Sequence, residues 1–271
     1  MKKQRVIGIV GGMGPLAGVA LMQSLVTHTE AAADQDHLPC ILMSLPGSMT
    51  DRTAFLEGRS VVNPAFAITE VIRKLTGSGA DVIGIACNTA HAEPIFDVVA
   101  AEVGKFAIHA HLLHMPLAVC DHIARHLPGG SRVGLMTTDG TYKTGLYRRL
   151  LAQRGYDVVV PDAHFQHKVI HRSIYDPVFG IKANPAHLTP SAKSRIGEAI
   201  AFFRQHGADA VLLGCTELSL AVGEREAGGM RMIDSTECFA KALIRAARPP
   251  QPVVTPRARA YRREEKIIFE G

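Results

Sequence analysis

The segment Gly84–His91 reads GIACNTAH, and a related segment, Leu212–Ser219, reads LLGCTELS. In each, a run of small apolar residues leads into one cysteine, and a threonine follows within two positions. The two cysteines, Cys87 and Cys215, are 128 positions apart. Apolar runs of this length that end in a polar turn are typical of buried strands. We therefore expect each cysteine at the carboxyl end of a strand.

Short β-branched runs alternate with longer helical patterns on both sides of these segments. The patterns predict strands over residues 6–10, 40–45, 81–86, 106–108, 132–136, 156–160, 208–213 and 231–233. They predict helices over 15–28, 63–76, 92–103, 115–125, 140–154, 191–206 and 235–245. This alternation predicts an α/β protein with parallel-rich sheets flanked by helices.

The order of motifs also repeats within the chain. VIGIVGGMGP opens the first half and RVGLMTTDGT opens the second, with Gly8 and Gly134 126 positions apart, close to the offset of the cysteines. Two similar offsets indicate a duplicated unit. We predict two pseudo-symmetric domains with the active site in the cleft between them. The first is residues 1–115, completed by 232–248, and the second is 116–231. Residues 249–271 form a proline-rich and then charged tail outside the catalytic unit.

Composition limits the function classes. The 271 residues are 47% hydrophobic, which is enough for substantial cores, and the formal net charge is only +5. That charge is too small to predict nucleic-acid binding. The five cysteines form no CxxC pair, the amino terminus does not resemble a secretory leader, and no apolar run is long enough for a membrane span. We predict a cytoplasmic protein that binds neither nucleic acid nor membrane.

Two thiols on opposite walls of one cleft suggest acid–base chemistry. Ligands of open parallel sheets bind beyond the carboxyl ends of the strands, where Cys87 and Cys215 are expected. One thiolate can remove a proton from a carbon while the other thiol returns a proton on the opposite face. This inverts the carbon without any redox change, so no cofactor is predicted.

Polar residues near the cysteines are candidates for substrate binding. Asn88, Thr89 and Thr216 can hold an α-carboxylate, although Asn88 and Thr216 can equally serve only as helix caps. Arg52, in an Asp-Arg-Thr loop, can grip a carboxylate or be a solvated loop arginine. Lys182 is a possible second cation, or a surface lysine. The predicted substrate-binding set also includes Gly12, Met13, Thr137 and Glu217.

Other motifs carry weaker signals. GGMGPLAG matches a dinucleotide signature, but no acidic residue follows the strand predicted over 40–45, so we expect the glycines to approach a small ligand instead. The histidines at 109, 111 and 114 fit no single helical face, and no metal site is predicted. His164, His167 and His171 share helical spacing, yet their charged neighbours predict a solvated face. The remaining cysteines, at 40, 120 and 238, are expected to be buried small hydrophobes.

The motifs IGIVGGMGPLAG, DRTAF, ACNTAH and LGCTE together resemble the PLP-independent aspartate/glutamate racemase superfamily, and its aspartate racemase branch in particular. The resemblance covers about residues 5–247. It implies two pseudo-symmetric α/β domains, cofactor-independent two-base racemisation and commonly a homodimer. By motif, Cys87 and Cys215 match the catalytic cysteines, whereas Asn88, Thr89 and Thr216 match residues that hold the α-carboxylate. Arg52 matches the cation for a side-chain carboxylate, and Lys182 is a looser match to a substrate lysine.

Two departures separate the chain from the glutamate racemases of the superfamily. Those usually begin with Asp-Ser-Gly and carry Cys-Thr-His, whereas this chain has Gly11-Gly12-Met13-Gly14 and Cys215-Thr216-Glu217. We therefore predict racemisation of aspartate, with glutamate possible. The alternatives are a related racemase or isomerase of another small carboxylic acid or hydantoin, a non-catalytic protein that binds acidic amino acids, and a nucleotide-dependent enzyme.

Overall fold

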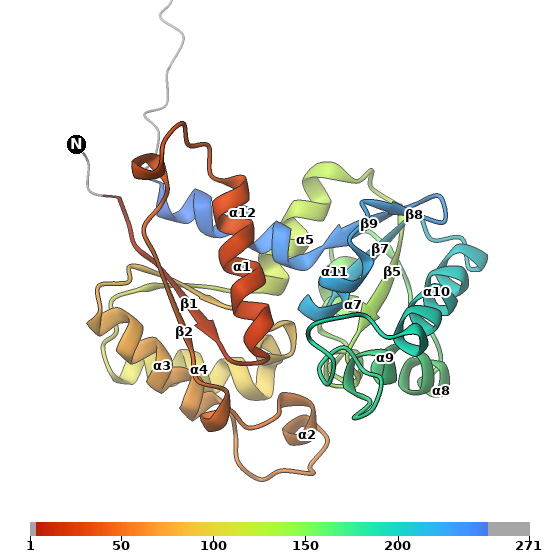
Figure 1. The fold of residues 1–271 in the computed structure, drawn as a ribbon, viewed down its shortest axis with the longest axis horizontal. Helices are drawn as coiled ribbons and strands as arrows, with labels where there is room; N and C mark the ends of the chain where they lie inside the picture. Colours follow the sequence, from red (N-terminus) through yellow and green to blue (C-terminus); the bar gives the residue numbers. More distant parts are fainter. Residues whose placement is uncertain (1–3, 249–271) are drawn as a thin grey trace, which may run out of the picture.

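Residues 4–248, the part of the chain that the computed structural model describes, form two α/β halves, each built on its own sheet (Figure 1). The first sheet has the order β2-β1-β3-β4 and is entirely parallel. Its strands are β1 (Ile7–Gly11), β2 (Cys40–Ser44), β3 (Val82–Ile85) and β4 (His111–Leu113). The predicted α/β class with parallel-rich sheets flanked by helices is thus confirmed.

The second sheet repeats this arrangement with one addition. Its order is β6-β5-β7-β9-β8, and only the edge strand β8 is antiparallel. The strands are β5 (Arg132–Thr137), β6 (Asp157–Val159), β7 (Ala210–Gly214), β8 (Glu226–Ala227) and β9 (Met230–Asp234). In each half the strand before a cysteine, β3 or β7, lies inside the sheet next to the strand that opens the half. This shared order is the topology that a duplicated unit would have.

Helices cover the sheets and connect parallel neighbours. The longer helices are α1 (Pro15–His28), α3 (Ala65–Gly77), α4 (Glu93–Lys105), α5 (Met115–His126), α10 (Pro190–Gln205) and α12 (Ser235–Ala247). The shorter ones are α2 (Arg52–Leu56), α6 (Asp139–Thr144), α7 (Leu146–Ala152), α8 (Ala163–Phe165), α9 (Arg172–Tyr175) and α11 (Thr216–Val222). A π-helix covers Gln166–His171, and 3₁₀ turns cover Asp34–Asp36, Pro46–Ser48 and Asn88–His91.

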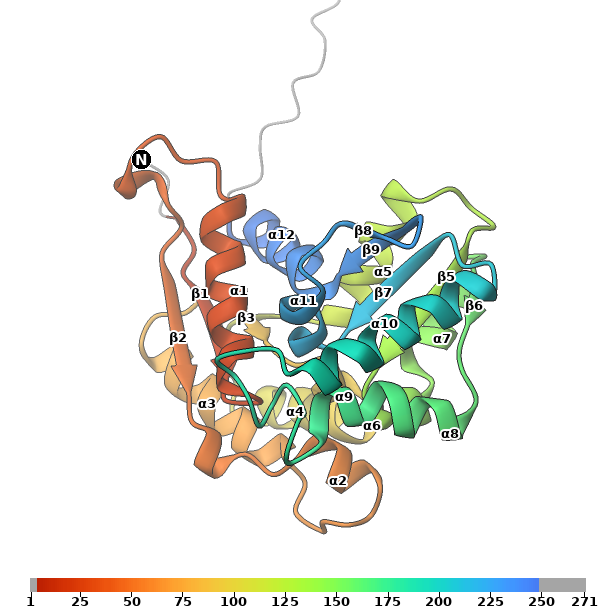
Figure 2. The ribbon, with the colours of Figure 1, turned by 45° about the vertical axis from the view of Figure 1, so that its right-hand side comes forward.

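The last helix, α12, follows the second sheet in sequence but packs on the first half. It lies beside α1 in both views of the ribbon (Figure 2). Phe239 and Leu243 on its buried face reach Gly84 in β3, where a Cβ atom would lie only 2.8 Å from Leu243. Gly84 therefore lets α12 approach the cysteine-bearing strand, and the helix joins the two halves.

Two expected elements are wrong. The strand expected over 106–108 is absent, because Phe106 ends α4 and Ala107 has a positive φ of 48°; the strand begins at His111 instead. The helix expected over 140–154 is broken at Gly145, whose φ of 64° separates α6 from α7. A left-handed residue cannot continue an α-helix, and glycine adopts that conformation at little cost.

Within residues 4–248, none of the helices combines the length and apolarity that crossing a membrane requires. The tail predicted over 249–271 lies outside the described residues, and the domain limits stay a prediction.

Replacing Gly134 with alanine should destabilise the fold. A Cβ at Gly134 would lie 2.5 Å from the ring of Phe203, which is completely buried and has no room to move. We expect a loss of about 1–3 kcal/mol in the free energy of unfolding, as for other overpacked cores.

Gly197→Ala is the matched control, because Gly197 is exposed in α10 and a Cβ there would meet no atom within 4 Å outside the backbone of its own helix. It should gain about 0.5–1 kcal/mol. Urea denaturation of both variants checks this; equal stabilities would contradict the packing argument.

Candidate active site

Cys87 and Cys215 occupy equivalent positions in the two halves. Each follows an inner strand and has an extended backbone, with φ and ψ of −159° and 114° for Cys87 and −147° and 131° for Cys215. Each then begins a helical turn, the 3₁₀ turn Asn88–His91 or α11. Both side chains are buried, at 7% and 6% exposure. The expected placement at the carboxyl ends of strands is what the structure shows.

The two cysteines line one small cavity together with residues of both halves. Its volume is about 10 Å³, close to the space of a single water molecule. The lining residues are Met13, Arg52, Cys87, Asn88, Thr89, Thr138, Tyr175, Lys182, Gly214, Cys215, Thr216 and Glu217. A wider groove of about 470 Å³ adjoins it and shares Met13, Arg52, Lys182 and Glu217 with it. These four side chains therefore separate the cavity from the groove.

The side chain of Asn88 connects the two halves behind the cavity. Its Oδ1 accepts a hydrogen bond of 2.5 Å from the Tyr147 hydroxyl, and its Nδ2 donates to Ser235 Oγ at 3.1 Å. Ser235 in turn donates to the carbonyl of Leu213 in β7 at 2.7 Å. All of these side chains are buried. The Asn88 amide thus ties the Cys87 turn to the strand before Cys215, and Asn88 also lines the cavity.

A second polar contact between the halves involves threonines. Thr89 Oγ1 lies 3.0 Å from both Thr138 Oγ1 and Thr141 Oγ1. The cavity is lined by Thr138, whereas Thr137, which the sequence predicted, is buried in β5 outside the lining. Thr138, one residue after Thr137, caps α6, and a substrate-binding role for Thr137 stays a prediction.

Arg52 is a buried cation at the start of α2. Its guanidinium is 6% exposed and donates to the carbonyls of Met13 at 2.9 Å and Thr50 at 3.2 Å. Its Nε has no hydrogen-bond partner among the described residues. Burial opposes its charge, but interactions with the side chains of Cys87 and Tyr175 outweigh burial and raise the pKa of Arg52. The alternative of a solvated loop arginine is therefore wrong.

The loop that carries Arg52 is fixed from both sides. Asp51 caps α2 by accepting a hydrogen bond from the Ala54 N–H at 2.7 Å. Its other carboxylate oxygen accepts from the Tyr175 hydroxyl at 3.0 Å, across the two halves. Tyr175 also lines the cavity. No sequence motif had indicated it, although it lies in the segment IYDPVFG that precedes Lys182.

Cys215 belongs to a chain of charged and polar groups. Its Sγ donates to Glu217 Oε2 at 3.1 Å, and the other carboxylate oxygen of Glu217 pairs with Lys182 Nζ. Burial and then the negative charge of Glu217 raise the pKa of the Cys215 thiol well above its usual value. Burial would also raise the pKa of Glu217, but Lys182 outweighs it and lowers that pKa. Cys215 is therefore held as a thiol beside a carboxylate.

His91 supports the turn of Cys87 from below. Its Nδ1 donates to the Cys87 carbonyl at 2.9 Å, and the ring is completely buried against Phe96, His114 and Phe239. Burial lowers the pKa of His91 to about 3, so the imidazole is neutral at physiological pH. Its role is to hold the backbone that carries the thiol.

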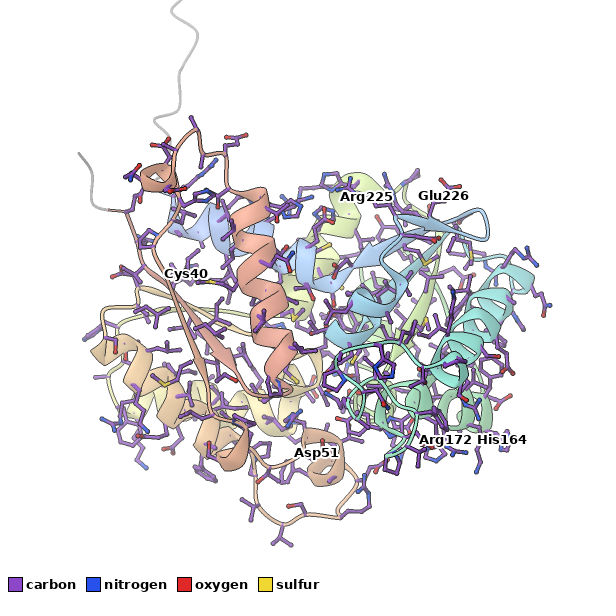
Figure 3. The ribbon with its side chains drawn as sticks, viewed as in Figure 1. Cys40, Asp51, His164, Arg172, Arg225 and Glu226 are labelled. Atoms are coloured by element: carbon purple, nitrogen blue, oxygen red, sulfur yellow. The ribbon has the colours of Figure 1, made fainter. Side chains whose placement is uncertain are left out.

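Of the other predicted residues, Met13 lines the cavity, and Gly12 lies in the adjoining groove. Gly12 has a positive φ of 90°, and a Cβ there would lie 3.0 Å from the backbone of Leu45 and Pro46. The glycine-rich start therefore serves a tight turn at the groove. Cys120 and Cys238 are buried, as expected, while Cys40 is only partly buried in β2 (Figure 3).

Comparison with known proteins gives the family. A model of the Asp/Glu/hydantoin racemases matches residues 10–243. The chain is 31% identical to the aspartate racemase of Picrophilus torridus, with a TM-score of 0.74, and the match covers 90% of this chain and 94% of that one. It is 26% identical over 247 residues to the broad specificity amino-acid racemase RacX of Bacillus subtilis, covering 88% of this chain and 96% of the relative.

A glutamate racemase of Francisella tularensis, solved with D-glutamate, shares the fold at 17% identity and a TM-score of 0.59, over 90% of this chain and 80% of that one. The fold and the paired cysteine turns define a two-domain α/β racemase. The chain belongs to the Asp/Glu/hydantoin racemase family. It is an amino-acid racemase, as the resemblance of its motifs implied.

Replacing Glu217 with glutamine should make Cys215 ionise at lower pH, because the variant loses the negative charge that opposes a thiolate and leaves Lys182 unpaired beside it. In a Cys87→Ala background we expect faster alkylation by iodoacetamide at pH 7, with the acid limb of the rate profile moved to lower pH. The other thiols should not react with iodoacetamide at this pH, because burial raises the pKa of Cys40 to about 11 and those of Cys120 and Cys238 to about 12.

The matched control for this variant is Glu57→Gln, which removes a carboxylate paired with Lys143 and Arg59 outside the cavity. Mass spectrometry locates the alkylated cysteine. An unchanged rate for Glu217→Gln would show that this carboxylate does not control the thiol.

Proposed function

We propose that the protein racemises an acidic amino acid, aspartate first and glutamate second, with Cys87 and Cys215 as its two acid–base groups. The observation that carries this proposal is that both thiols line one buried cavity together with the buried cation Arg52. The homodimer and the cytoplasmic location stay predictions.

The charges around the cavity favour a substrate with two carboxylates. Arg52 and Lys182 are cations, and Glu217 is the only carboxylate among the lining residues. Lys182 and Glu217 pair with each other, which leaves Arg52 as the cation of the lining that is free to bind the carboxylate of aspartate or glutamate. Arg52 has only carbonyl partners and a free Nε among the described residues, so it is the group best able to bind the distal carboxylate.

The size of the cavity favours the shorter side chain. A volume of about 10 Å³ does not admit an amino acid, so the groups between cavity and groove must move when substrate enters. Aspartate needs less of this movement than glutamate because it lacks one methylene. We propose that substrate enters from the groove beside Met13 and Lys182.

The resting charges suggest which thiol begins as the base. The Cys215 thiol donates a hydrogen bond to Glu217, whereas the guanidinium of Arg52 interacts favourably with a thiolate at Cys87. We propose that Cys87 removes the Cα proton from one face and that Cys215 delivers its proton to the other. After this step Cys87 is protonated and Cys215 is the thiolate, which is the reverse of the starting state. The starting state returns when Cys215 regains a proton and Cys87 loses one. The hydroxyls of Thr89 and Thr216 hold the α-carboxylate, which takes up charge as the carbanion forms.

One observation favours a wider substrate range. Lys182 is already neutralised by Glu217, and apolar groups of Met13, Leu16, Ile181 and Pro185 line the adjoining groove. A neutral amino acid with a larger side chain would find a compatible surface there. A chiral assay of the purified protein with a panel of amino acids and no added cofactor separates the possibilities. Inactivity on every dicarboxylic amino acid would overturn the preference for acidic substrates.

Alanine at either cysteine should abolish racemisation, since inversion needs a base and an acid on opposite faces. Each remaining thiol can still remove and return a proton on its own side. NMR in deuterated water should therefore show Cα exchange of one enantiomer by Cys215→Ala and of the other by Cys87→Ala. Cys40→Ala, in β2 and outside the cavity, should racemise normally. Near-normal racemisation by either cavity variant would refute the two-base mechanism.

Arg52→Ala should lower kcat/KM for aspartate roughly 30- to 700-fold, because the distal carboxylate loses a buried charge-assisted partner. This corresponds to a loss of about 2–4 kcal/mol in transition-state stabilisation. Alanine racemisation should fall far less, because alanine has no distal carboxylate. Arg59→Ala is the control, because Arg59 is an exposed arginine that follows α2. If Arg52→Ala reduced both substrates equally, Arg52 would instead bind the α-carboxylate or support the fold.

A further inference from the structure

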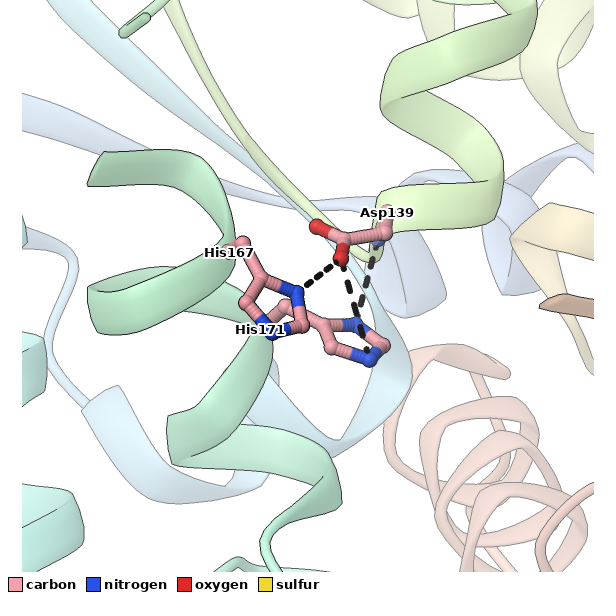
Figure 4. Close-up of side chains that lie close together, drawn as sticks. All are labelled: Asp139, His167 and His171. Atoms are coloured by element: carbon pink, nitrogen blue, oxygen red, sulfur yellow. Dashed lines mark hydrogen bonds and ion pairs between the residues drawn. The ribbon is translucent and has the colours of Figure 1, made fainter. Parts of the chain in front are cut away.

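Asp139 is a buried carboxylate whose charged partners are two histidines. It begins α6 and its side chain is 5% exposed. Its Oδ2 lies 2.6 Å from His167 Nδ1 and 3.9 Å from His171 Nε2 (Figure 4). In residues 4–248, no lysine or arginine lies within ion-pair distance of it. A buried carboxylate is stabilised by a cationic partner or a metal ion, and among the described residues these two histidines are the groups available to Asp139 for either role.

A π-helix brings the two histidines to the same side. His167 and His171 are four residues apart in the wide turn Gln166–His171, and their rings stack with centroids 5.5 Å apart. Both rings point toward Asp139 (Figure 4). Single π turns of this kind often mark functional sites. The prediction of a solvated face for His164, His167 and His171 is thus wrong for His171, which is buried.

The carboxylate is oriented from the far side. Gln166 is 1% exposed, and its Nε2 donates to Asp139 Oδ1 at 3.1 Å and to the Thr137 carbonyl at 2.9 Å. One oxygen of Asp139 is therefore held, while the other is directed at the histidines. Amide groups that orient a ligating carboxylate in this way are typical of metal centres.

We propose that Asp139, His167 and His171 form a binding site for a divalent transition-metal ion of the zinc type. Two imidazole nitrogens and one carboxylate oxygen are a donor set that suits zinc, with a water molecule at the fourth position. The ligand atoms lie within 4.8 Å of one another. The separations of 2.6 and 3.9 Å lie on either side of the roughly 3.3 Å expected between tetrahedral ligands of zinc, so side-chain rotations would bring the three ligand atoms to zinc distances.

One existing hydrogen bond must break when the ion binds. His171 Nδ1 accepts from the Asp139 N–H at 3.2 Å, so its proton is on Nε2. Coordination through Nε2 moves this proton to Nδ1 and ends the contact. The contact is long, and the released N–H lies in the first turn of α6, where amides have no partner within the helix. His167, whose side chain is 53% exposed, leaves a route for the ion from solvent.

The site is separate from the cysteines but touches the same cavity wall. Thr138, which precedes Asp139, lines the cavity, and the ring of His171 stacks on Tyr175 with centroids 4.6 Å apart. A bound ion would therefore restrain two lining residues of the second half. The proposal does not depend on the proposed reaction, because its test measures metal binding.

Calorimetric titration of Zn²⁺ into the full-length protein tests this site. Cys87 and Cys215 are first replaced with serine, because thiols in the cavity also bind zinc. We expect one ion per chain, and Co²⁺ should give visible ligand-field bands without a sulfur-to-cobalt charge-transfer band. His167→Ala and Asp139→Asn should each weaken binding at least tenfold. His164→Ala should leave it unchanged, because His164 is exposed one turn earlier in α8 (Figure 3).

Several outcomes would overturn the proposal. These are no saturable binding, a cobalt spectrum that shows sulfur ligation, or equal losses for His164→Ala and His167→Ala. The half-exposed position of His167 keeps the comparison valid even where Asp139→Asn does not fold. Circular dichroism of each variant provides the check of folding.

Discussion

The buried amide of Asn88 fixes how the two halves face each other. It accepts from Tyr147 in the second half and donates to Ser235 at the start of α12, and Ser235 donates to the strand that carries Cys215. Each such hydrogen bond contributes only about 1 kcal/mol to stability. Its importance is positional, because the two thiols can perform the proposed acid–base reaction on opposite faces of one carbon only when their separation is fixed.

The halves share a topology but differ in the charges around their thiols. Cys215 has a carboxylate within hydrogen-bond distance, and that carboxylate is itself neutralised by Lys182. Cys87 has the guanidinium of Arg52 instead, held by carbonyls from its own half. The shared topology thus places the two cysteines at equivalent positions at the ends of inner strands, and residues around them give them different electrostatic surroundings. The difference comes from Arg52 at the start of α2 in the first half, and from Glu217 in α11 with its partner Lys182 in the second.

The sequence was sufficient to predict most of the strands and the two cysteine turns. Buried parallel strands leave a continuous apolar signal, and the spacing of Gly8 and Gly134 is close to that of Cys87 and Cys215. It was insufficient where a local backbone feature decided the outcome. Gly145 looked like a tolerated helix residue, and only its left-handed backbone shows that it divides two helices. His171 looked solvated because its neighbours in sequence are charged, and the π turn reverses that expectation by facing it inward. The position of the Tyr175 side chain depends on its hydrogen bond to Asp51, which is 124 positions away in the sequence. No local sequence pattern predicts such a contact.

The unequal surroundings of the two thiols cannot make the protein prefer one direction of racemisation. The enantiomers of an amino acid have equal free energy, so the equilibrium constant of racemisation is 1. Because the ratio of the two kcat/KM values equals this constant, kcat/KM must be the same for both enantiomers. What Glu217 and Arg52 can change is how that common value divides between kcat and KM.

If the resting protein is mostly in the form with Cys215 protonated, the enantiomer whose Cα–H faces Cys87 binds the major form and has the lower KM. Its mirror image binds only the minor form, so its apparent affinity falls by the fraction of that form. Its kcat is higher by the same factor. In the proposed two-thiol mechanism, the Lys182–Glu217–Cys215 chain therefore determines which enantiomer saturates the protein at low concentration, while the overall equilibrium stays racemic.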